Sequence, residues 1–291
     1  MAYRDKMDSD SLLRFIESIA KEPSLAPSVL FFTGGEPFLR AAEIRDIVSV
    51  LAPLETKFHA ISGGYFLRNI PLSPGILETI GRLDSLSISW DRYHQEFMEE
   101  AQLLAGLCVL KATGVQLSIQ FAYHDQLEME DAKRKFEGFP IFFSPIANAG
   151  RANDNDLAAH FGVGADVPCR SAAWPVISYN GQIVSCCNQD IIDAEPANVP
   201  AHLLLGTIWD SSWSEVVSRR RTCATITQIE TLGPASLSED CTFTLLPQCV
   251  ACRKLPSDLK PRQVSRALRD AVAAIHDRSI SGQLRGVESD V

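Results

Sequence analysis

The sequence predicts an α/β fold, in which a parallel sheet is connected by crossover helices, followed by a smaller region rich in cysteine. Two observations predict the sheet. Short apolar runs alternate with amphipathic helical patterns over the first half of the chain, and several of those runs end in glycine or polar turns, where α/β folds place their ligands. The third observation concerns the second region, since seven of the eight cysteines lie beyond residue 150.

Composition and charge exclude several classes of protein. The chain has 291 residues, 46% hydrophobic and 22% charged, which is sufficient for a sizeable core. Its net charge of −9 argues against nucleic acid or an anionic membrane as the main partner, because both require a basic face. No apolar run approaches the roughly 20 residues of a membrane span, and the polar N-terminus does not resemble a signal peptide. We therefore expect a soluble, cytoplasmic protein that binds neither nucleic acid nor membrane.

The elements of the sheet region follow from the spacing of their apolar residues. The first predicted helix follows capping residues and ends before Pro23, and the last one is highly charged. Because a helix separates each strand from the next, the strands are expected to run parallel. Short apolar runs predict strands at residues 28–32, 57–61, 85–90, 115–122 and 140–144. Helical spacing predicts helices at residues 8–20, 40–52, 74–82, 95–112 and 126–136.

Beyond this region the pattern changes. Asn180-Gly181, between two alternating runs, predicts a β-hairpin. A short helix is expected at 212–221 and an amphipathic one around 262–277, followed by residues without periodicity. The expected organisation is a sheet domain at 1–152, a polar linker at 153–168, a cysteine-rich domain at 169–257, and a C-terminal helix with a tail at 258–291.

A first cluster of candidate functional residues follows the first strand, in the motif Thr33-Gly34-Gly35-Glu36-Pro37. The two glycines allow a backbone conformation barred to other residues and a close approach of a ligand. Glu36 presents a carboxylate to a cationic group, and Pro37 stiffens the turn. The alternative interpretation is a strand-to-helix turn with an exposed acid, and this motif alone would favour that alternative.

A second cluster consists of cysteines at ligand spacing. Cys169 and Cys186 form a C-x11-G-x4-C pattern through Gly181, and Cys249 and Cys252 form a CxxC. A CxxC lets two thiolates reach one metal centre from a single tight turn, and the hairpin brings a third thiolate near a fourth. Four thiolates suit zinc or an iron–sulfur cluster, and spacing does not choose between them. Buried apolar cysteines are the alternative, which the combined spacing disfavours.

Other cysteines and histidines are set aside at this point. Cys187 would point away from Cys186 if the segment is a strand, while Cys241 stays open as an alternative ligand. Cys108 lies in an apolar helical pattern and is expected in the core. A lone histidine such as His94 is more often a structural hydrogen-bonding residue than a ligand.

The motifs, and their order along the chain, resemble those of the radical S-adenosylmethionine (radical SAM) enzymes with a SPASM or twitch extension. A glycine-glycine-glutamate-proline motif after an early barrel strand, followed by C-x9–15-G-x4-C and CxxC, is typical of that superfamily. The resemblance covers roughly residues 10–255. Smaller matches are Ser62-Gly63-Gly64-Tyr65, Leu86-Ser87-Ile88-Ser89-Trp90-Asp91, Gly150-Arg151-Ala152 and Leu205-Gly206-Thr207-Ile208-Trp209.

The resemblance implies a partial (β/α)6 TIM-type barrel, here without its first strand, plus a small α+β domain. It implies that Gly34, Gly35 and Glu36 hold the amino group of S-adenosylmethionine, with Pro37 shaping the turn, and that Ser89 contacts its ribose or carboxylate. It further implies one auxiliary [4Fe–4S] cluster, because no cysteine follows the CxxC as in a full SPASM module. Its ligands would be Cys169, Cys186, Cys249 and Cys252.

One departure from the superfamily is severe. Its C-x3-C-x2-C motif, which supplies three thiolates to the catalytic cluster, does not occur in this sequence. We therefore expect the chain as written to be inactive in radical generation. The competing explanations are a start codon assigned too far downstream, a truncated copy, or a degenerate paralogue kept for binding.

Two functional hypotheses follow. In the first, the chain is the larger part of a radical SAM oxidoreductase that uses a 5′-deoxyadenosyl radical to abstract a hydrogen atom from its substrate. That substrate would be a peptide undergoing maturation or a small molecule, and the electron donor a flavodoxin or ferredoxin. In the second, the chain is a non-enzymatic protein with a four-cysteine zinc or iron–sulfur site, which acts as a recognition or partner subunit.

Overall fold

The computed structural model describes residues 7–145 and 164–256. The chain divides into two compact units. The sheet unit comprises the described residues of Ile19–Ala147, and the cysteine unit comprises those of Met1–Ser18 together with Asn148–Val291. The Gly150-Arg151-Ala152 motif and the helix predicted around 262–277 lie outside the described residues.

The sheet unit is built on five strands in sequence order, each parallel to its neighbour. This confirms the predicted α/β fold and all five predicted strands to within two residues at each end. The strands are β1 (Val29–Phe32), β2 (Lys57–Ser62), β3 (Ser85–Trp90), β4 (Gln116–Tyr123) and β5 (Ile141–Pro145).

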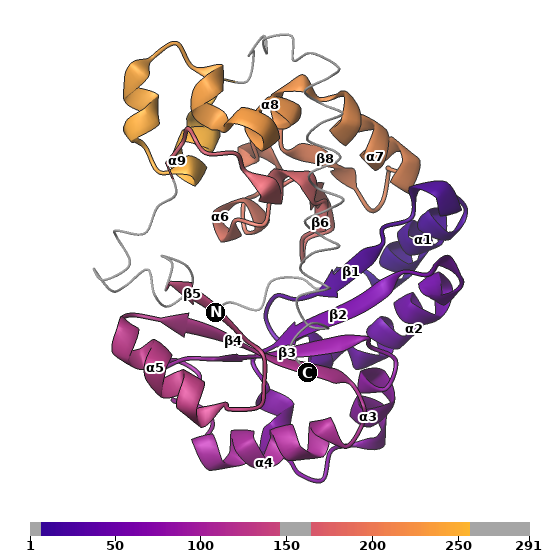
Figure 1. Ribbon diagram of the computed structural model, residues 1–291. Coiled ribbons are helices and arrows are strands. Elements are labelled where there is room, and N and C mark those ends of the chain that lie inside the picture. Colours follow the sequence, from indigo (N-terminus) through magenta and orange to yellow (C-terminus); the bar gives the residue numbers. More distant parts are fainter. Residues whose placement is uncertain (1–6, 146–163, 257–291) are drawn as a thin grey trace. The chain divides into compact units, whose positions relative to one another are not determined.

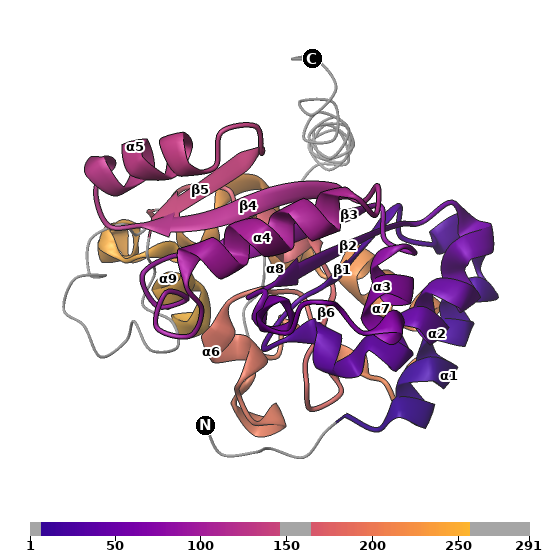
Figure 2. The same ribbon diagram turned by 90° about the horizontal axis from the view of Figure 1, so that it is seen from below.

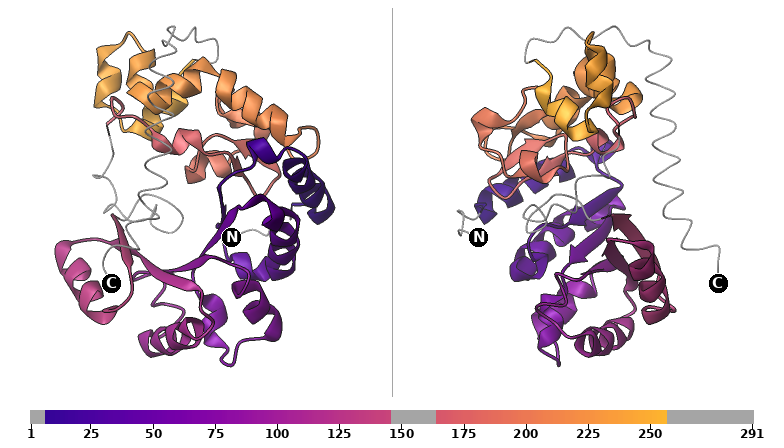
Figure 3. Two further views of the ribbon diagram at one scale, coloured as in Figure 1. Left: turned by 45° about the vertical axis from the view of Figure 1, so that its right-hand side comes forward. Right: turned by 90° about the vertical axis from the view of Figure 1, so that its left-hand side faces the viewer.

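Helices cover one face of this sheet, as Figures 1 and 2 show. Leu86 and Ile88 of β3 and Ile119 of β4 are fully buried on that face. The alternate positions are polar, and Ser87 Oγ lies 2.6 Å from Ser118 Oγ on the neighbouring strand. A parallel sheet with helices on its outer face forms a partial barrel, seen from two further sides in Figure 3. The helices are α2 (Ala41–Leu51), α3 (Pro74–Ile80), α4 (Glu100–Lys111) and α5 (Gln126–Lys135).

The helix predicted at 95–112 begins later than expected, at Glu100. Asp91 Oδ1 accepts hydrogen bonds from the backbone N–H groups of Tyr93 (2.8 Å) and His94 (3.0 Å), so the chain turns after β3 instead of entering the helix. The side chain of Gln102 then accepts from the N–H of Glu99 at the start of α4.

The expectation that Cys108 lies in the core is wrong, because its side chain is exposed. Leu103, Leu107 and Leu110 of the same helix are fully buried. The helix therefore has one core-facing side, and Cys108 lies off it.

The cysteine unit contains a small antiparallel sheet and five short helices. Helix α1 packs beside α7 in Figure 1, with the rings of Phe15 and Trp213 edge to face at 6.4 Å, and the Trp213 N–H donates to Ser18 Oγ at 3.0 Å. The strands are β6 (Val176–Ile177), β7 (Gln182–Val184) and β8 (Leu204–Thr207). The helices are α1 (Ser9–Ala20), whose residues up to Ser18 belong to this unit, α6 (Gln189–Ile192), α7 (Trp213–Thr222), α8 (Ala224–Leu232) and α9 (Gln248–Lys254).

The predicted hairpin is confirmed between β6 and β7, which pair antiparallel. Gly181 adopts φ 77°, a left-handed conformation that favours glycine, and its N–H donates to the carbonyl of Ser178 at 2.9 Å. The Trp209 ring lies so close that a Cβ on Gly181 would be 2.5 Å from it. This turn therefore requires glycine for two reasons.

The predicted linker is described only at residues 164–168. There Ala165 is fully buried, and its N–H donates to the carbonyl of Leu246 at 3.2 Å. None of the helices in the two described ranges combines the length and the apolar character that crossing a bilayer requires.

Candidate functional site

The first candidate site lies where the strands of the sheet unit end. Because β1, β2 and β3 are parallel, the segments that follow them lie at one edge of the sheet. These segments are Thr33–Pro37, Gly63–Gly64 and Asp91–His94, and Ser62 is the last residue of β2 beside them.

The two glycines after β1 have the conformations that the motif predicts. Gly34 has φ 84° and Gly35 has φ 54°, both left-handed. A Cβ built on either glycine would meet no heavy atom within 4 Å. The backbone here is therefore open to close approach by a ligand.

Glu36 is held by neutral hydrogen-bond donors. Ser62 Oγ lies 2.9 and 2.8 Å from its two carboxylate oxygens, and the Phe38 N–H donates to Oε1 at 3.1 Å. Burial raises the pKa of Glu36 above its ordinary value, and the hydrogen bonds from Ser62 and from backbone N–H groups offset this only in part. A cationic ligand stabilises the charged form of such a carboxylate more than a neutral donor does. The ammonium group of S-adenosylmethionine is a ligand of this kind.

Ser62 is a functional candidate that the sequence analysis names only as part of the Ser62-Gly63-Gly64-Tyr65 match, without a role of its own. Its side chain is buried, and its Oγ also accepts from the Gly64 N–H at 2.9 Å. This second bond fixes the hydroxyl beneath Glu36. The two residues are 26 positions apart, so only the pairing of β1 with β2 brings them together.

An aspartate–histidine pair lies at the same edge. Asp91 Oδ1 is 2.8 Å from His94 Nδ1. Burial alone would raise the pKa of Asp91, but hydrogen bonds from the His94 side chain and from two backbone N–H groups hold it below its ordinary value. Nε2 of His94 lies against the next turn, 3.3 Å from where a Cβ on Gly63 would stand. The histidine set aside in the sequence therefore belongs to this edge.

Ser89 is the remaining predicted residue of this site. It lies next to the last residue of β3, in register with Gln120 of β4. That register places it on the polar face of the sheet together with Ser87. A role for Ser89 toward a ribose or carboxylate stays a prediction.

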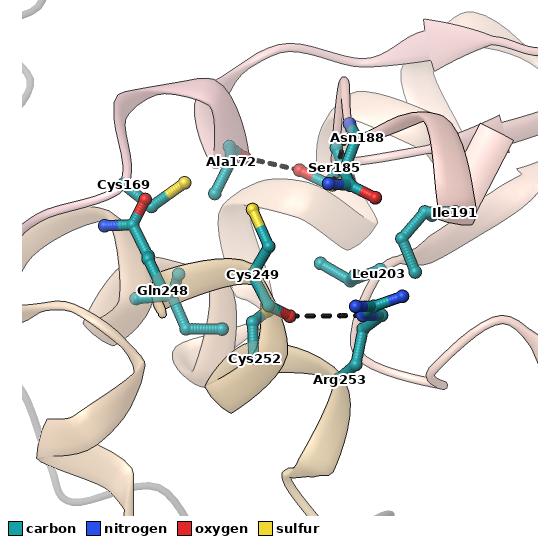
Figure 4. Close-up of a pocket in the computed structure, with 12 residues that line it drawn as sticks. Cys169, Ala172, Ser185, Asn188, Ile191, Leu203, Gln248, Cys249, Cys252 and Arg253 are labelled. Atoms are coloured by element: carbon teal, nitrogen blue, oxygen red, sulfur yellow. Dashed lines mark hydrogen bonds between the residues drawn. The ribbon is translucent and has the colours of Figure 1, made fainter. Parts of the chain in front are cut away.

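The second candidate site is a pocket in the cysteine unit, and all four predicted cysteines line it. Its volume is about 390 Å³, part of which is open to solvent. Figure 4 shows the sulfur atoms of Cys169 and Cys249 pointing into the pocket. Cys186 follows β7, while Cys249 and Cys252 both lie on α9. Segments up to 83 residues apart in the chain thus bring four thiols to one place.

The CxxC is not on a tight turn, as the sequence analysis expected, but in the helix α9. Two residues three apart in a helix lie on one face, so both side chains reach the pocket. Arg253 Nε donates to the carbonyl of Cys249 at 3.3 Å, as Figure 4 shows.

Of the four cysteines that line this pocket, Cys169, Cys186 and Cys252 are half-buried and Cys249 is exposed. Burial raises the pKa of Cys186 and of Cys252 to about 12, and it also raises the pKa of Cys169 and of Cys249. Charge on other pocket cysteines raises the pKa of Cys169, Cys186 and Cys252 further, and charge on Cys187 raises the pKa of Cys249. A metal or cluster would take up the thiolates and release protons.

The four thiols are compatible with a cluster or with a single ion, and the two place different demands on the sulfur positions. Within residues 7–145 and 164–256, no three histidine, cysteine, aspartate or glutamate side chains are arranged to hold one metal ion. A mononuclear zinc site needs four sulfurs about 2.3 Å from one point. A [4Fe–4S] cluster offers each thiolate its own iron, so its ligands need not converge in this way. Cys187 is exposed and does not line the pocket, and the Cys241 side chain is outside what the structure describes.

One further residue at this site went unnoticed in the sequence. His202 Nε2 lies 3.5 Å from Cys252 Sγ, and burial lowers the pKa of this histidine to about 4. Its distance of 50 residues from Cys252 leaves no spacing signal that would have revealed the contact.

Comparisons with known proteins concern the fold and a distant relative. No protein-family model matches the chain. A curated relative is the "putative peptide biosynthesis protein YydG" of Bacillus subtilis, 20% identical over 202 residues. The match covers 65% of this chain and 63% of the relative, so it spans less than two thirds of the relative's length.

The solved structures similar to this chain include three of anSMEcpe. With bound AdoMet, anSMEcpe is 11% identical, with a TM-score of 0.53, and the match covers 99% of this chain and 91% of that one. With bound AdoMet and the peptide Kp18Cys, it is 12% identical, with a TM-score of 0.51 and coverages of 99% and 92%. With AdoMet and the peptide Cp18Cys, it is 12% identical, with a TM-score of 0.53 and coverages of 98% and 91%.

The fold and the two sites define an α/β partial-barrel protein with a cysteine-rich extension. The chain shares the fold of anSMEcpe. Together with the relative, this agrees with the resemblance to radical SAM enzymes of the SPASM type that the motifs indicate.

Proposed function

We propose that this chain is a radical SAM oxidoreductase component that acts on a peptide and holds one auxiliary [4Fe–4S] cluster. The observation that carries the proposal is Glu36, a half-buried carboxylate with neutral partners directly after two left-handed glycines. The four-cysteine pocket, the peptide-biosynthesis relative and the peptide-bound structures of anSMEcpe support it.

In this proposal the sheet edge binds the amino-acid end of S-adenosylmethionine. Glu36 accepts charge-assisted hydrogen bonds from the ammonium group, and the open backbone of Gly34 and Gly35 lies beside it. Ser62 holds the carboxylate in place, Pro37 sets the turn, and Ser89 contacts the ribose or the carboxylate of the cofactor.

The bound cofactor would supply a radical that abstracts a hydrogen atom from the substrate once it is reductively cleaved. That cleavage needs a catalytic cluster, whose three-cysteine motif is not in the printed sequence. The proposed chemistry therefore applies to a protein that also carries that motif. The residues of this chain bind and orient the cofactor and hold the auxiliary cluster.

In the cysteine unit, Cys169, Cys186, Cys249 and Cys252 would ligate the auxiliary cluster. The pocket walls are largely apolar, with Ile191, Leu203 and Ile229 among the lining residues, so they would limit access of water to the cluster. A flavodoxin or ferredoxin is the proposed electron donor. A four-thiolate zinc site is the competing occupant, and metal analysis separates the two.

Cofactor binding tests the role of Glu36. In equilibrium dialysis with S-adenosylmethionine at neutral pH, Glu36→Gln is expected to weaken binding by roughly 10- to 100-fold, because the charge-assisted bond is lost. Glu78→Gln is a matched control, since Glu78 is exposed, forms ion pairs with Arg82 and Arg45, and is not part of the motif. Equal affinity of Glu36→Gln and the wild type would contradict the assignment.

A further inference from the structure

His202 lies in a well-fixed turn beside the four-cysteine pocket. The turn precedes β8, and the Leu203 N–H donates to the carbonyl of Pro200 at 2.8 Å. The carbonyl of Leu203 accepts from the Ser185 N–H, also at 2.8 Å. Leu203 is only 1% exposed and belongs to an apolar cluster with Val184. Backbone bonds and packing on either side therefore fix the position of residue 202.

The imidazole contacts one particular sulfur. His202 Nε2 lies 3.5 Å from Cys252 Sγ, a normal distance for a hydrogen bond to sulfur. Cys252 packs against the same apolar cluster as Leu203, so water competes poorly for this contact. An imidazole carries a proton on Nε2 in one neutral tautomer and in its charged form, and a thiolate has no proton to give. With Cys252 ligated, Nε2–H is the donor.

We propose that His202 is a positioning residue for the iron–sulfur cluster, donating its Nε2–H to the ligating sulfur of Cys252 and thereby raising the reduction potential of the cluster. The inference rests on the proposed cluster ligation. A hydrogen bond to a ligand sulfur withdraws negative charge from the cluster and stabilises its reduced form. The acceptor of this hydrogen bond is the sulfur of Cys252, which is itself the proposed ligand. The bond can therefore change the potential without a movement of the chain.

A redox titration of the anaerobically reconstituted protein tests the proposal. His202→Ala is expected to lower the midpoint potential while iron and sulfide contents stay at the wild-type level. His202→Gln, whose amide can place an N–H near the former Nε2, is expected to return the potential toward the wild-type value. Circular dichroism checks that both variants fold.

Cys223→Ser is the matched control. The Cys223 thiol lies 3.9 Å from the carbonyl of His202, yet Cys223 does not line the pocket. This variant disturbs the surroundings of His202 without touching Cys252, so its potential is expected to stay unchanged. A shift as large as that of His202→Ala would mean that the potential responds to packing, and would overturn the proposal.

Two other results would also overturn it. Equal potentials in the wild type and His202→Ala would exclude the donor role. Loss of iron from a folded His202→Ala variant, with a nitrogen coupling in the wild-type electron paramagnetic resonance signal, would make His202 a ligand instead.

A wild-type chain that takes up zinc and no sulfide would refute the proposed cluster itself. In that case, nitrogen-15 NMR of the zinc form tests the contact between His202 Nε2 and Cys252 Sγ, because it shows whether Nε2 carries a proton. A proton on His202 Nε2 supports donation to Cys252, and a metal-bound Nε2 contradicts it.

Discussion

At the scale of single residues, two carboxylates at the same sheet edge respond to burial in opposite ways. Asp91 receives enough hydrogen bonds, from His94 and from backbone N–H groups, to hold its pKa below its ordinary value of 3.8. Glu36 receives too few, and burial raises its pKa above its ordinary value of 4.5. In our account this difference reflects function. Glu36 is proposed to bind a cationic ligand, whereas Asp91 is paired with His94.

The pH dependence of stability tests this contrast. A native pKa below the unfolded one adds stability that is lost as the pH falls, so Asp91→Asn is expected to flatten the acid-side loss below about pH 3.8. A native pKa above the unfolded one removes stability as the pH rises, so Glu36→Gln is expected to flatten a decline above about pH 4.5. Urea unfolding between pH 2.5 and 6.5, a range of roughly 4 units around both groups, measures both slopes. For each variant, the quantity compared is the change, relative to the wild type, in the slope of the unfolding free energy against pH. Changes of the same sign for Asp91→Asn and Glu36→Gln would contradict the account.

The sequence predicted residues whose signal is local and missed those whose partners are distant. Glu36 was found because it belongs to a short motif, and the four cysteines were found because of their spacing. The role of Ser62 and the whole of His202 were missed, because their contacts with Glu36 and Cys252 form only when the strands pair and the cysteine unit folds. Asp91 was named only as the end of the match at residues 86–91, and no role was assigned to it.

At the scale of secondary structure, the hairpin turn at Gly181 combines a left-handed backbone with a close aromatic neighbour. Gly181→Ala is expected to destabilise the protein by more than the roughly 1–2 kcal/mol that a left-handed conformation costs an L-residue, because the Trp209 ring must also move. Thermal or urea unfolding, followed by circular dichroism, measures the loss.

Gly138→Ala is the matched control for that prediction. Gly138 has φ 87°, and a Cβ there would meet no heavy atom within 4 Å, so it shares the backbone strain without the clash. A loss of stability at Gly181 no larger than at Gly138 would show that the Trp209 contact is unimportant.

Element boundaries were the less predictable part of the fold. The five strands were found from apolar runs, but the start of α4 was placed too early, because the turn that Asp91 stabilises was not evident from apolar spacing. Helices α6, α8 and α9 were not predicted at all. Of these, α9 is a single stretch of seven residues whose position depends on packing more than on its own helix propensity.

At the scale of the whole molecule, the chain combines two units with different chemistry. The sheet unit has a hydrogen-bonded carboxylate, Glu36, at a polar edge of the sheet, and the cysteine unit has four thiols around a largely apolar pocket. The class of fold followed from the alternation of strands and helices, and the parallel sheet confirms it. The identity of the group in the cysteine pocket does not follow from spacing, because zinc and iron–sulfur clusters use the same thiolates.

The most direct test of the account is the metal content of the anaerobically reconstituted chain. We predict about four iron and four acid-labile sulfide per chain, with absorbance at about 400 nm. The double variant Cys249→Ala, Cys252→Ala should lose both, and Cys187→Ala should keep them, because Cys187 does not line the pocket. Stoichiometric zinc without sulfide, or a cluster that survives loss of the CxxC, would contradict the central claim.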